Sequence, residues 1–364
     1  MKKYVFSIFL YFVEILLICS SQAQTNPKII TRGLVDTVGY AHLGWQMDSV
    51  MARIDVLNRN DLIHAEQAQG TVWKAAICPH DDYTYAGWLY HAVLRNITAK
   101  TVIIFGVAHK ARLFNLENEL VFDSYKFWHG PYGPVKISAL RDELIKRLPE
   151  GMAVVHDSMQ AVEHSVEGLI PFLQYQDRNV EIISILVPYM DFTTMKSISQ
   201  QLAKALHSIM AEENLQWGKD IALLISSDAV HYGDEEWGGS NYAPYGTDST
   251  GNAEAVAHEK EIINTCFSGA LTEEKVAQFF SYTVNPENFK EYKWTWCGRY
   301  SIPFGLLTSK QLQFLEKSTT LTGVPVAYAT SISQTRLKVD DLKMGKTAIA
   351  TPHHWVGYPA IGFK

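Results

Sequence analysis

Three short apolar runs of the sequence are each followed, within three residues, by a side chain that can bind a metal ion or move a proton. These side chains are His80, His109 and Asp228, and His231 comes shortly after Asp228. In a parallel sheet, the carboxyl ends of the strands form the edge at which ligands bind. Neutral imidazole is a frequent metal ligand, and it can also accept and release a proton. The spacing therefore predicts a metal site or a proton-transfer site at one edge of a sheet.

A cysteine near the end of the chain is a further candidate ligand. The segment Trp296–Arg299 contains Cys297 and precedes an apolar helical pattern at Ile302–Leu307. A thiolate at this position would lie near a helix N-terminus, where the helix dipole lowers its pKa. Two other interpretations of Cys297 stay open: a buried small apolar side chain, or one half of a disulfide with Cys78 or Cys266.

The other polar candidates also have purely structural interpretations. A single histidine in a chain with 13 of them is more often a surface or hydrogen-bonded core residue than a ligand. Asp81 and Asp82 are typical of turns, and we expect at least one of them to form a turn. The segment Glu163–Glu167 is typical of a solvated helix start, although His164 or a neighbouring glutamate could instead orient a metal ligand.

The remaining patterns predict the elements that position these residues. Buried strands are predicted at Val72–Ile77, Thr101–Gly106, Val180–Val187 and Ile221–Ser226, and later strands at Val324–Ser331 and Ala360–Phe363. Helices are predicted at Ala86–Ile97, Ser138–Leu148, Met195–Ile209 and Ala253–Phe267. Alternation of buried strands with helices predicts a single α/β domain with a central, mostly parallel sheet that is flanked by helices.

Residues 1–23 have the layout of a secretory signal peptide. Lys2 and Lys3 precede a largely apolar run, and Ser21–Ala23 resembles a small-residue cleavage site. Cleavage there predicts a mature chain of residues 24–364, located in the periplasm or outside the cell. No second stretch of the sequence is long and apolar enough to predict a membrane span in the mature chain.

Composition and charge exclude several classes of protein. Apolar residues make up 47% of the chain and charged residues 19%, which excludes disordered, collagen-like and coiled-coil architectures. Lys and Arg number 32 against 38 Asp and Glu, and no basic run is present that could neutralise phosphates. Nucleic acid is therefore not an expected partner.

Five motifs together resemble those of the Memo-like family, in the same order along the chain. They are the histidine motif from Pro79 to Gly87, the turn from Gly106 to His109, the segment Glu163–Glu167 followed by Pro171, the run from Ser226 to Gly233, and Cys297–Arg299. The segment Tyr328–Ser331 also resembles a late strand of the family. The resemblance therefore extends from about residue 32 to the end of the chain. Bacterial members of this family are called AmmeMemoRadiSam system protein B.

The resemblance implies a fold like that of the class III extradiol dioxygenases, with one α/β domain and a metal site at the edge of its sheet. It implies metal ligands at His80, His109 and Cys297. His231 would be the catalytic acid or base. Asp228, the second catalytic candidate, would line the same pocket and fix the tautomer of His231 or accept a substrate hydroxyl. Iron(II) is the ion expected for a redox enzyme with this ligand set, and copper or zinc would also fit. The expected substrate is a small molecule, and the dioxygenase resemblance favours an aromatic ring.

Two other functions stay open. The same pocket could bind a peptide or a small molecule without catalysis, or it could hold zinc for hydrolysis with His231 as the base. The chain departs from the family pattern at Asp81, Asp82, Lys110, Leu169 and Tyr300. The two aspartates predict a pocket that is more acidic close to the metal, which argues against an anionic ligand.

Overall fold

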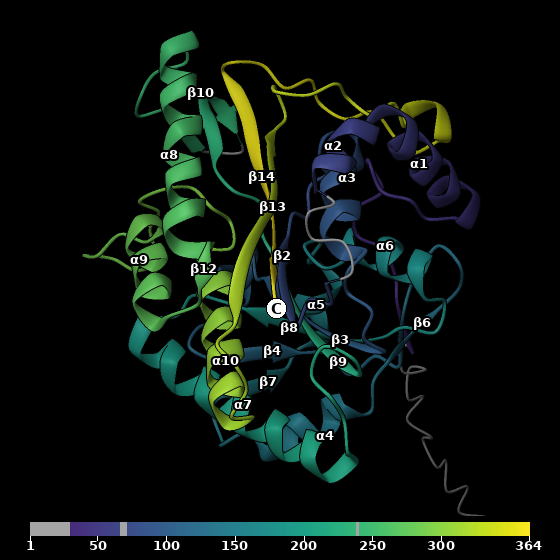
Figure 1. Cartoon of the computed structure of the whole chain (residues 1–364), viewed down its shortest axis with the longest axis vertical. Coiled ribbons are helices and arrows are strands. Elements are labelled where there is room, and N and C mark those ends of the chain that lie inside the picture. Colours follow the sequence, from purple (N-terminus) through teal and green to yellow (C-terminus); the bar gives the residue numbers. More distant parts are fainter. Residues whose placement is uncertain (1–29, 66–70, 238–239) are drawn as a thin grey trace, which may run out of the picture.

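The structure is a computed structural model that describes residues 30–65, 71–237 and 240–364. The predicted signal peptide, residues 1–23, lies outside the described residues. In the described part of the chain, a central sheet has helices on both of its faces (Figure 1). The predicted α/β architecture, in a single domain, is therefore confirmed.

The sheet is mixed, with a parallel centre. Its central strands lie side by side in the order β8 (Glu181–Val187), β3 (Thr101–Val107), β9 (Ile221–Ser226) and β2 (Ala75–Cys78). Beyond β2 the pairing is antiparallel, first to β14 (His354–Phe363) and from there to both β13 (Thr322–Thr330) and β10 (His231–Trp237). The shorter strands are β1 (Thr31–Arg32), β4 (Leu120–Phe122), β5 (Phe127–Trp128), β6 (Val135–Ile137), β7 (Ala153–Val155), β11 (Ser240–Tyr242) and β12 (Gly269–Ala270).

Two sets of helices pack against the opposite faces of this sheet (Figure 1). One face carries α1 (Gly44–Leu57), α2 (Arg59–His64), α3 (Tyr83–Leu94), α5 (Asp157–Ala161) and α6 (Leu169–Gln176). The other face carries α4 (Leu140–Arg147), α7 (Phe192–Glu213), α8 (Ser249–Phe267), α9 (Glu273–Thr283) and α10 (Ser301–Leu315). Each set of helices covers its own apolar core.

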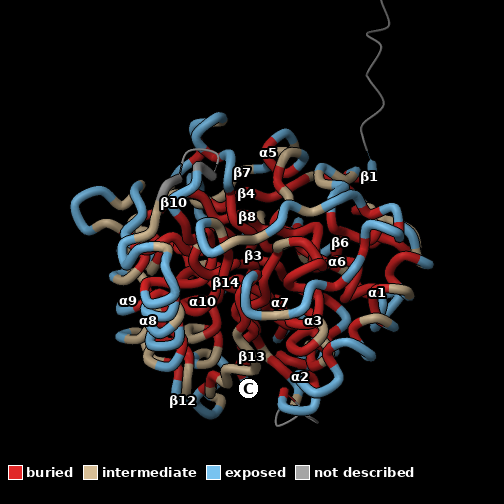
Figure 2. Tube along the Cα trace, turned by 90° about the horizontal axis from the view of Figure 1, so that it is seen from above, coloured by how far each residue is buried: buried red, intermediate tan, exposed pale blue. Residues whose placement is uncertain are grey.

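The central strands belong to both cores because successive side chains point to opposite faces. In β9, Ala222 and Leu224 pack into the core under α3, whereas Leu223 and Ile225 pack into the core under α7 and α10. Strands buried on both faces are apolar throughout, and this explains why they stand out in the sequence as continuous apolar runs. Figure 2 shows the resulting distribution, with buried residues concentrated inside and exposed residues on the outer segments.

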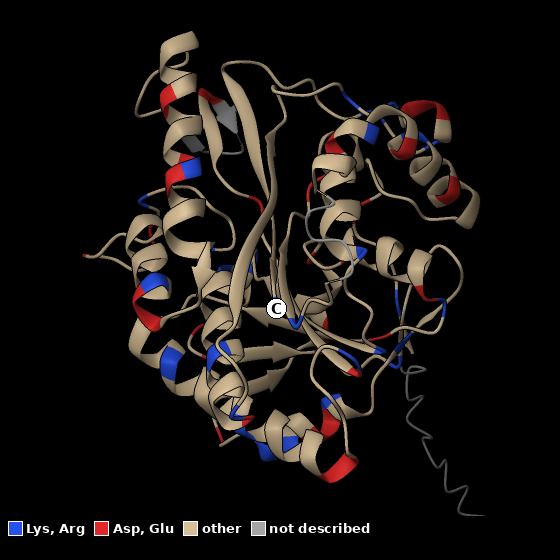
Figure 3. Cartoon of the chain, in the orientation of Figure 1, with Lys and Arg blue, Asp and Glu red and all other residues tan. Residues whose placement is uncertain are grey.

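Charged residues of both signs lie on the outer helices and loops, and the central strands carry few of them (Figure 3). A search of the described residues finds no helix with the length and apolar character needed to cross a membrane.

The predicted elements are confirmed, with shifted boundaries. The strand predicted at Ile221–Ser226 has those bounds in the structure, whereas the strand predicted at Ala360–Phe363 begins earlier, at His354. The early part of β14 contains Gly357 and Pro359, which are unfavourable in strands by local propensity. Pairing with β13 and β10 overrides that local preference.

We expect the replacement of Leu224 by alanine to lower the free energy of unfolding by about 2–5 kcal/mol, because the side chain is fully buried in a central strand. Leu113→Ala is the matched control: its side chain is 75% exposed, and the change should stay within about 0.5 kcal/mol. Urea denaturation of both variants measures the difference. Similar losses in the two variants would contradict the packing described for β9.

Candidate metal centre

The residues predicted to carry the chemistry lie at the carboxyl edge of the parallel strands. His80 comes two residues after β2, Asp228 two residues after β9, and His109 two residues after β3. Since β9 lies between β2 and β3, Asp228 follows the middle strand of the three. Residues that are far apart in the sequence are thereby brought to one edge of the sheet, as the sequence predicts.

Hydrogen bonds fix which ring nitrogen of His80 is available to a ligand. The side chain is buried, and its Nδ1 lies 2.8 Å from Ser226 Oγ. The Ser226 hydroxyl donates its only proton to the carbonyl oxygen of Ser165, so it must accept a hydrogen bond from His80 Nδ1–H. The lone pair is therefore on Nε2, which lies 3.5 Å from Cys297 Sγ and 3.4 Å from Asp228 Oδ2.

A buried glutamate orients His109 in a similar way. The Glu163 carboxylate accepts hydrogen bonds from His109 Nδ1 and from the His109 backbone N–H, both at 2.8 Å. Burial alone would raise the pKa of Glu163, but the charge and hydrogen bond of His109 outweigh it and bring this pKa to about 2. His109 Nδ1 thus carries a proton, and in the neutral ring the lone pair is on Nε2. The hypothesis that a glutamate of this segment orients a candidate ligand is confirmed, whereas a solvated position for Glu163 is wrong.

Cys297 is buried against the loop that carries Asp228. The Asp228 backbone N–H donates to Cys297 Sγ at 3.1 Å, and the Ser227 hydroxyl lies 3.9 Å from the sulfur. The three cysteines of the described residues, Cys78, Cys266 and Cys297, are all free thiols. The disulfide interpretation of Cys297 therefore finds no support in the structure.

The sequence predicts a lowered pKa for the Cys297 thiol, and this prediction is wrong. Helix α10 begins only at Ser301, and burial together with the negative charge of Asp228 raises the pKa of the thiol well above its ordinary value. Desolvation thus outweighs the dipole of the following helix. An ion bound at this sulfur would have to displace the thiol proton.

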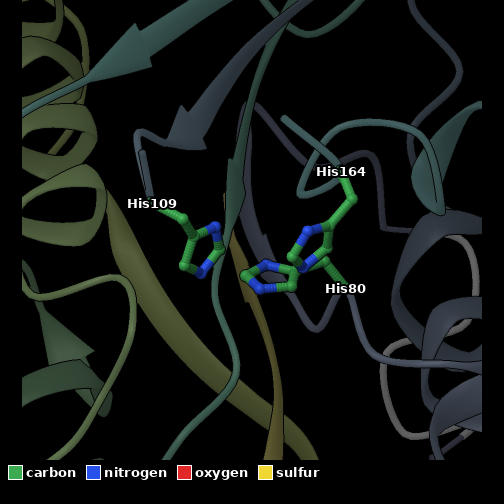
Figure 4. Close-up of side chains that lie close together, drawn as sticks. All are labelled: His80, His109 and His164. Carbon is green, nitrogen blue, oxygen red and sulfur yellow. The ribbon is translucent and has the colours of Figure 1, made fainter. Parts of the chain in front are cut away.

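Two overlapping groups of side chains bring their ligand atoms within 4.8 Å of one another. One group is His80, His109 and His164 (Figure 4), and the other is His80, Asp228 and Cys297. The three ligands predicted from the sequence are therefore distributed over two adjoining groups that share His80. The His164 ring stacks on the His109 ring, with centroids 4.8 Å apart, and both approach the His80 ring edge-on.

One residue from each group lines a small cavity, whereas His80 and Asp228 do not line it, so the expected position of Asp228 in this pocket is wrong. The volume of the cavity is about 80 Å³, and both His109 and Cys297 line it. The segment Val187–Tyr189 at the end of β8 forms another part of the wall, together with Tyr292, Arg299 and Tyr300. Strand β8 thus contributes no ligand but does shape the cavity.

His231 lies at the start of β10, on a segment held next to the one that carries Cys297. Val230 forms an isolated bridge with Trp296, so the residues preceding His231 and Cys297 are paired. Desolvation and nearby histidines, His109 first among them, lower the pKa of His231 to about 3. The pKa near neutrality expected from the sequence is therefore wrong, and the ring is neutral at physiological pH.

Acidic side chains cluster beside His80. Asp228 Oδ1 accepts from the backbone N–H groups of His80 and Asp81, at 2.9 Å and 3.3 Å. Asp81 accepts from the Tyr358 hydroxyl at 2.6 Å and from the Asp82 backbone N–H at 2.8 Å, so it holds the turn that follows β2. Desolvation raises the pKa of both Asp228 and Asp82 well above the ordinary value.

Comparison with known proteins now identifies the family. A family model described as Memo-like protein matches residues 49–341. The chain belongs to the Memo-like family. This confirms the resemblance that the five motifs indicate.

Relatives of this Memo-like protein include archaeal proteins. A MEMO1 family protein of Pyrobaculum arsenaticum is 30% identical over 162 residues, which cover 43% of this chain and 52% of the relative. A MEMO1 family protein of Pyrococcus furiosus is 25% identical over 189 residues, which cover 50% of this chain and 60% of the relative. The match with these relatives thus spans little more than half of their length.

One residue that positions the site of this Memo-like protein is not identified by the sequence patterns. Glu259 of α8 is fully buried and accepts from the Trp296 indole N–H at 2.6 Å and from the Val230 backbone N–H at 3.1 Å. It therefore ties together the two segments that lead to the predicted acid–base histidine and to the predicted thiol ligand. Its spacing from Ile262 and Ile263 places this glutamate on the apolar face of the helix. That position could have indicated a buried carboxylate.

The low pKa of Glu163 predicts a loss of stability in acid. Because this pKa is about 2 in the folded protein and about 4.3 in an unfolded chain, the carboxylate contributes roughly 3 kcal/mol of stability at pH 7. That contribution is lost as the pH falls from about 4.5 to 2. Glu163→Gln should therefore unfold more easily at pH 7, with a difference from the parent protein that shrinks in this window.

Denaturant titrations between pH 2 and 7 measure this difference. The exposed Glu143, which pairs with Lys146 on the surface, provides the control variant Glu143→Gln. The control should follow the parent protein throughout. A constant difference between Glu163→Gln and the parent protein from pH 7 to 2 would contradict the assigned role of Glu163.

Proposed function

We propose that this Memo-like protein is a redox enzyme that depends on iron(II), or on copper, held by His80, His109 and Cys297. The observation that carries the proposal is that hydrogen bonds hold the proton of each histidine on Nδ1. Both rings therefore keep the Nε2 lone pair available for an ion, as metal-ligating histidines do. The cavity lined by both His109 and Cys297 is a second support.

The donor set fits the proposed ions. Two imidazoles and one thiolate suit iron, copper or zinc, and three protein ligands leave positions open for a substrate. A bound iron(II) or copper ion would supply one-electron chemistry with dioxygen or a reduced oxygen species. Cys297 is a buried, protonated thiol, so loading the site should release its proton.

His231 is the residue that we propose to move a proton. Its ring is neutral at physiological pH and so has the protonation state of a base, but a pKa of about 3 makes it a weak one. Asp228 acts differently, because its carboxyl holds the backbone of the loop that presents His80. The small cavity with its tyrosine walls suits a flat, ring-shaped substrate.

Metal content provides the first test of the proposed function. Protein purified without chelator should contain near-stoichiometric iron or copper, and His80→Ala, His109→Ala and Cys297→Ala should each lose it. His231→Ala should keep the ion but lose dioxygen consumption with catechol as the probe substrate, because a proton acceptor is not a ligand. Elemental analysis and an oxygen electrode measure the two quantities.

The other outcomes separate the rival functions. Zinc in the parent protein would favour a hydrolase, and no metal in any variant would favour a binding module. His164→Ala is the matched control, because its ring stacks on that of His109 but is not a proposed ligand. Loss of the ion in His164→Ala and not in Cys297→Ala would move the ligand set to the three-histidine group.

We also propose that the protein is exported to the periplasm or the medium. The support is the layout of residues 1–23, with basic residues, an apolar run and a small-residue cleavage site. The exported protein should begin at Gln24 when its N-terminus is sequenced, and a variant that lacks residues 2–23 should stay in the cytoplasm. An intact N-terminus on protein from the cytoplasmic fraction would contradict this.

A further inference from the structure

Three arginines of the described residues are buried, and two of them have buried carboxylate partners. Arg32 pairs with Glu167, and Arg141 pairs with Asp123 at 2.7 Å. Arg299 is 4% exposed, between the 2% of Arg32 and the 8% of Arg141, yet it takes part in no ion pair with the described residues. Because an unpaired buried charge is costly, the absent counter-ion calls for an explanation.

Most of the hydrogen-bond donors of Arg299 are also unused. Nη2 donates to the Lys290 carbonyl oxygen at 2.9 Å, whereas Nε and Nη1 meet no acceptor with good hydrogen-bond geometry among the described residues, and the Tyr300 hydroxyl is the polar group that interacts with this guanidinium. The guanidinium carbon lies 3.5 Å from the centroid of the Tyr292 ring. This cation–π contact engages the charge but leaves the N–H donors of Nε and Nη1 without a well-aligned acceptor.

The neighbouring side chains do not supply the anion. Glu291, next to the residue that accepts from Arg299, pairs instead with the exposed Arg112 at 3.1 Å. Burial raises the pKa of Tyr300 to about 12, although Arg299 acts in the opposite direction. The Tyr300 hydroxyl is therefore neutral at physiological pH, and it donates to the carbonyl oxygen of Phe289.

We propose that Arg299 binds the carboxylate of a small substrate in the cavity that Arg299 shares with His109 and Cys297. The inference rests on the proposed function and deepens it, because it names the substrate class of the same site. The flat carbon part of the substrate would contact the rings of the tyrosines that line the cavity, which are Tyr189, Tyr292 and Tyr300. None of the described residues that line this cavity is acidic.

A carboxylate matches the geometry of this site. The planar fork of a guanidinium fits the two oxygens of a carboxylate. The tyrosine rings that line the cavity add flat apolar surface, which suits a carboxylate attached to a ring. Asp81 and Asp82, which we expect from the sequence to disfavour an anion, do not line this cavity.

Benzoate and its neutral counterpart benzamide are the probes that test the proposal. Calorimetric titration of chelator-treated protein should show benzoate binding at least tenfold more tightly than benzamide, since a charge-assisted hydrogen bond would be lost. Arg299→Met should weaken benzoate binding at least tenfold and leave benzamide binding unchanged. Arg299→Lys, which keeps the charge but not the planar fork, should weaken benzoate binding by a smaller factor.

Two controls separate this role from a structural one. Arg112→Gln changes an exposed charge near the same tyrosines and should alter benzoate affinity less than threefold. In thermal unfolding, Arg299→Met should be at least as stable as the parent protein. Arg141→Met leaves the buried Asp123 carboxylate without its partner, so this variant should have a lower melting temperature.

Specific outcomes would overturn the inference. Equal affinities of the parent protein for benzoate and benzamide, or unchanged benzoate affinity in Arg299→Met, would do so. Destabilisation of Arg299→Met to the extent seen in Arg141→Met would make the arginine structural. Because the titration uses chelator-treated protein, a negative metal analysis would leave the carboxylate site standing and overturn only the proposed redox function.

Discussion

The carboxyl ends of β2, β9 and β3 lie level with one another, and the candidate site depends on this register. Cys78 of β2 pairs with Ser226 of β9, and Ile225 of β9 pairs with Phe105 of β3. A slip by one residue would reverse the face of every side chain in the strand. The register is fixed because alternate side chains of these strands pack into two different helical cores, so a slip would replace the contacts of both cores at once. Packing in the cores therefore determines where the histidines lie.

Polar groups at this edge are oriented by partners that are themselves buried. Glu163 holds His109, and Ser226 holds His80. Glu259 binds the segments that precede His231 and Cys297. Every such bond offsets the cost of taking a polar group out of water, and each also removes a degree of freedom from a candidate ligand or base. The same network thus stabilises the fold and holds the candidate ligands in place.

Arg299 is a buried polar group that lacks such a partner for its charge. For stability alone, a carboxylate partner or an apolar side chain at this position would be more favourable. Arg299 lies on the wall of the cavity that His109 and Cys297 also line, where the proposed substrate carboxylate would neutralise its charge. Asp81 and Asp228, by comparison, lie beside His80 and are held by Tyr358 and by backbone N–H groups. Glu163 is held by His109.

The sequence by itself determined the strands, the residue types at their ends and the family. Strands such as Ile221–Ser226 could be predicted because burial on both faces leaves a local apolar pattern. The hydrogen-bond partners of the histidines could not be predicted, because each pair is far apart in the sequence. His80 and Ser226 are 146 positions apart, and His109 and Glu163 are 54 positions apart. Only the tertiary structure decided the protonated nitrogen of each ring, the raised pKa of the Cys297 thiol, the approach of His164 and the isolation of Arg299. Each of these depends on desolvation and on contacts between distant segments, and a linear pattern carries no record of either.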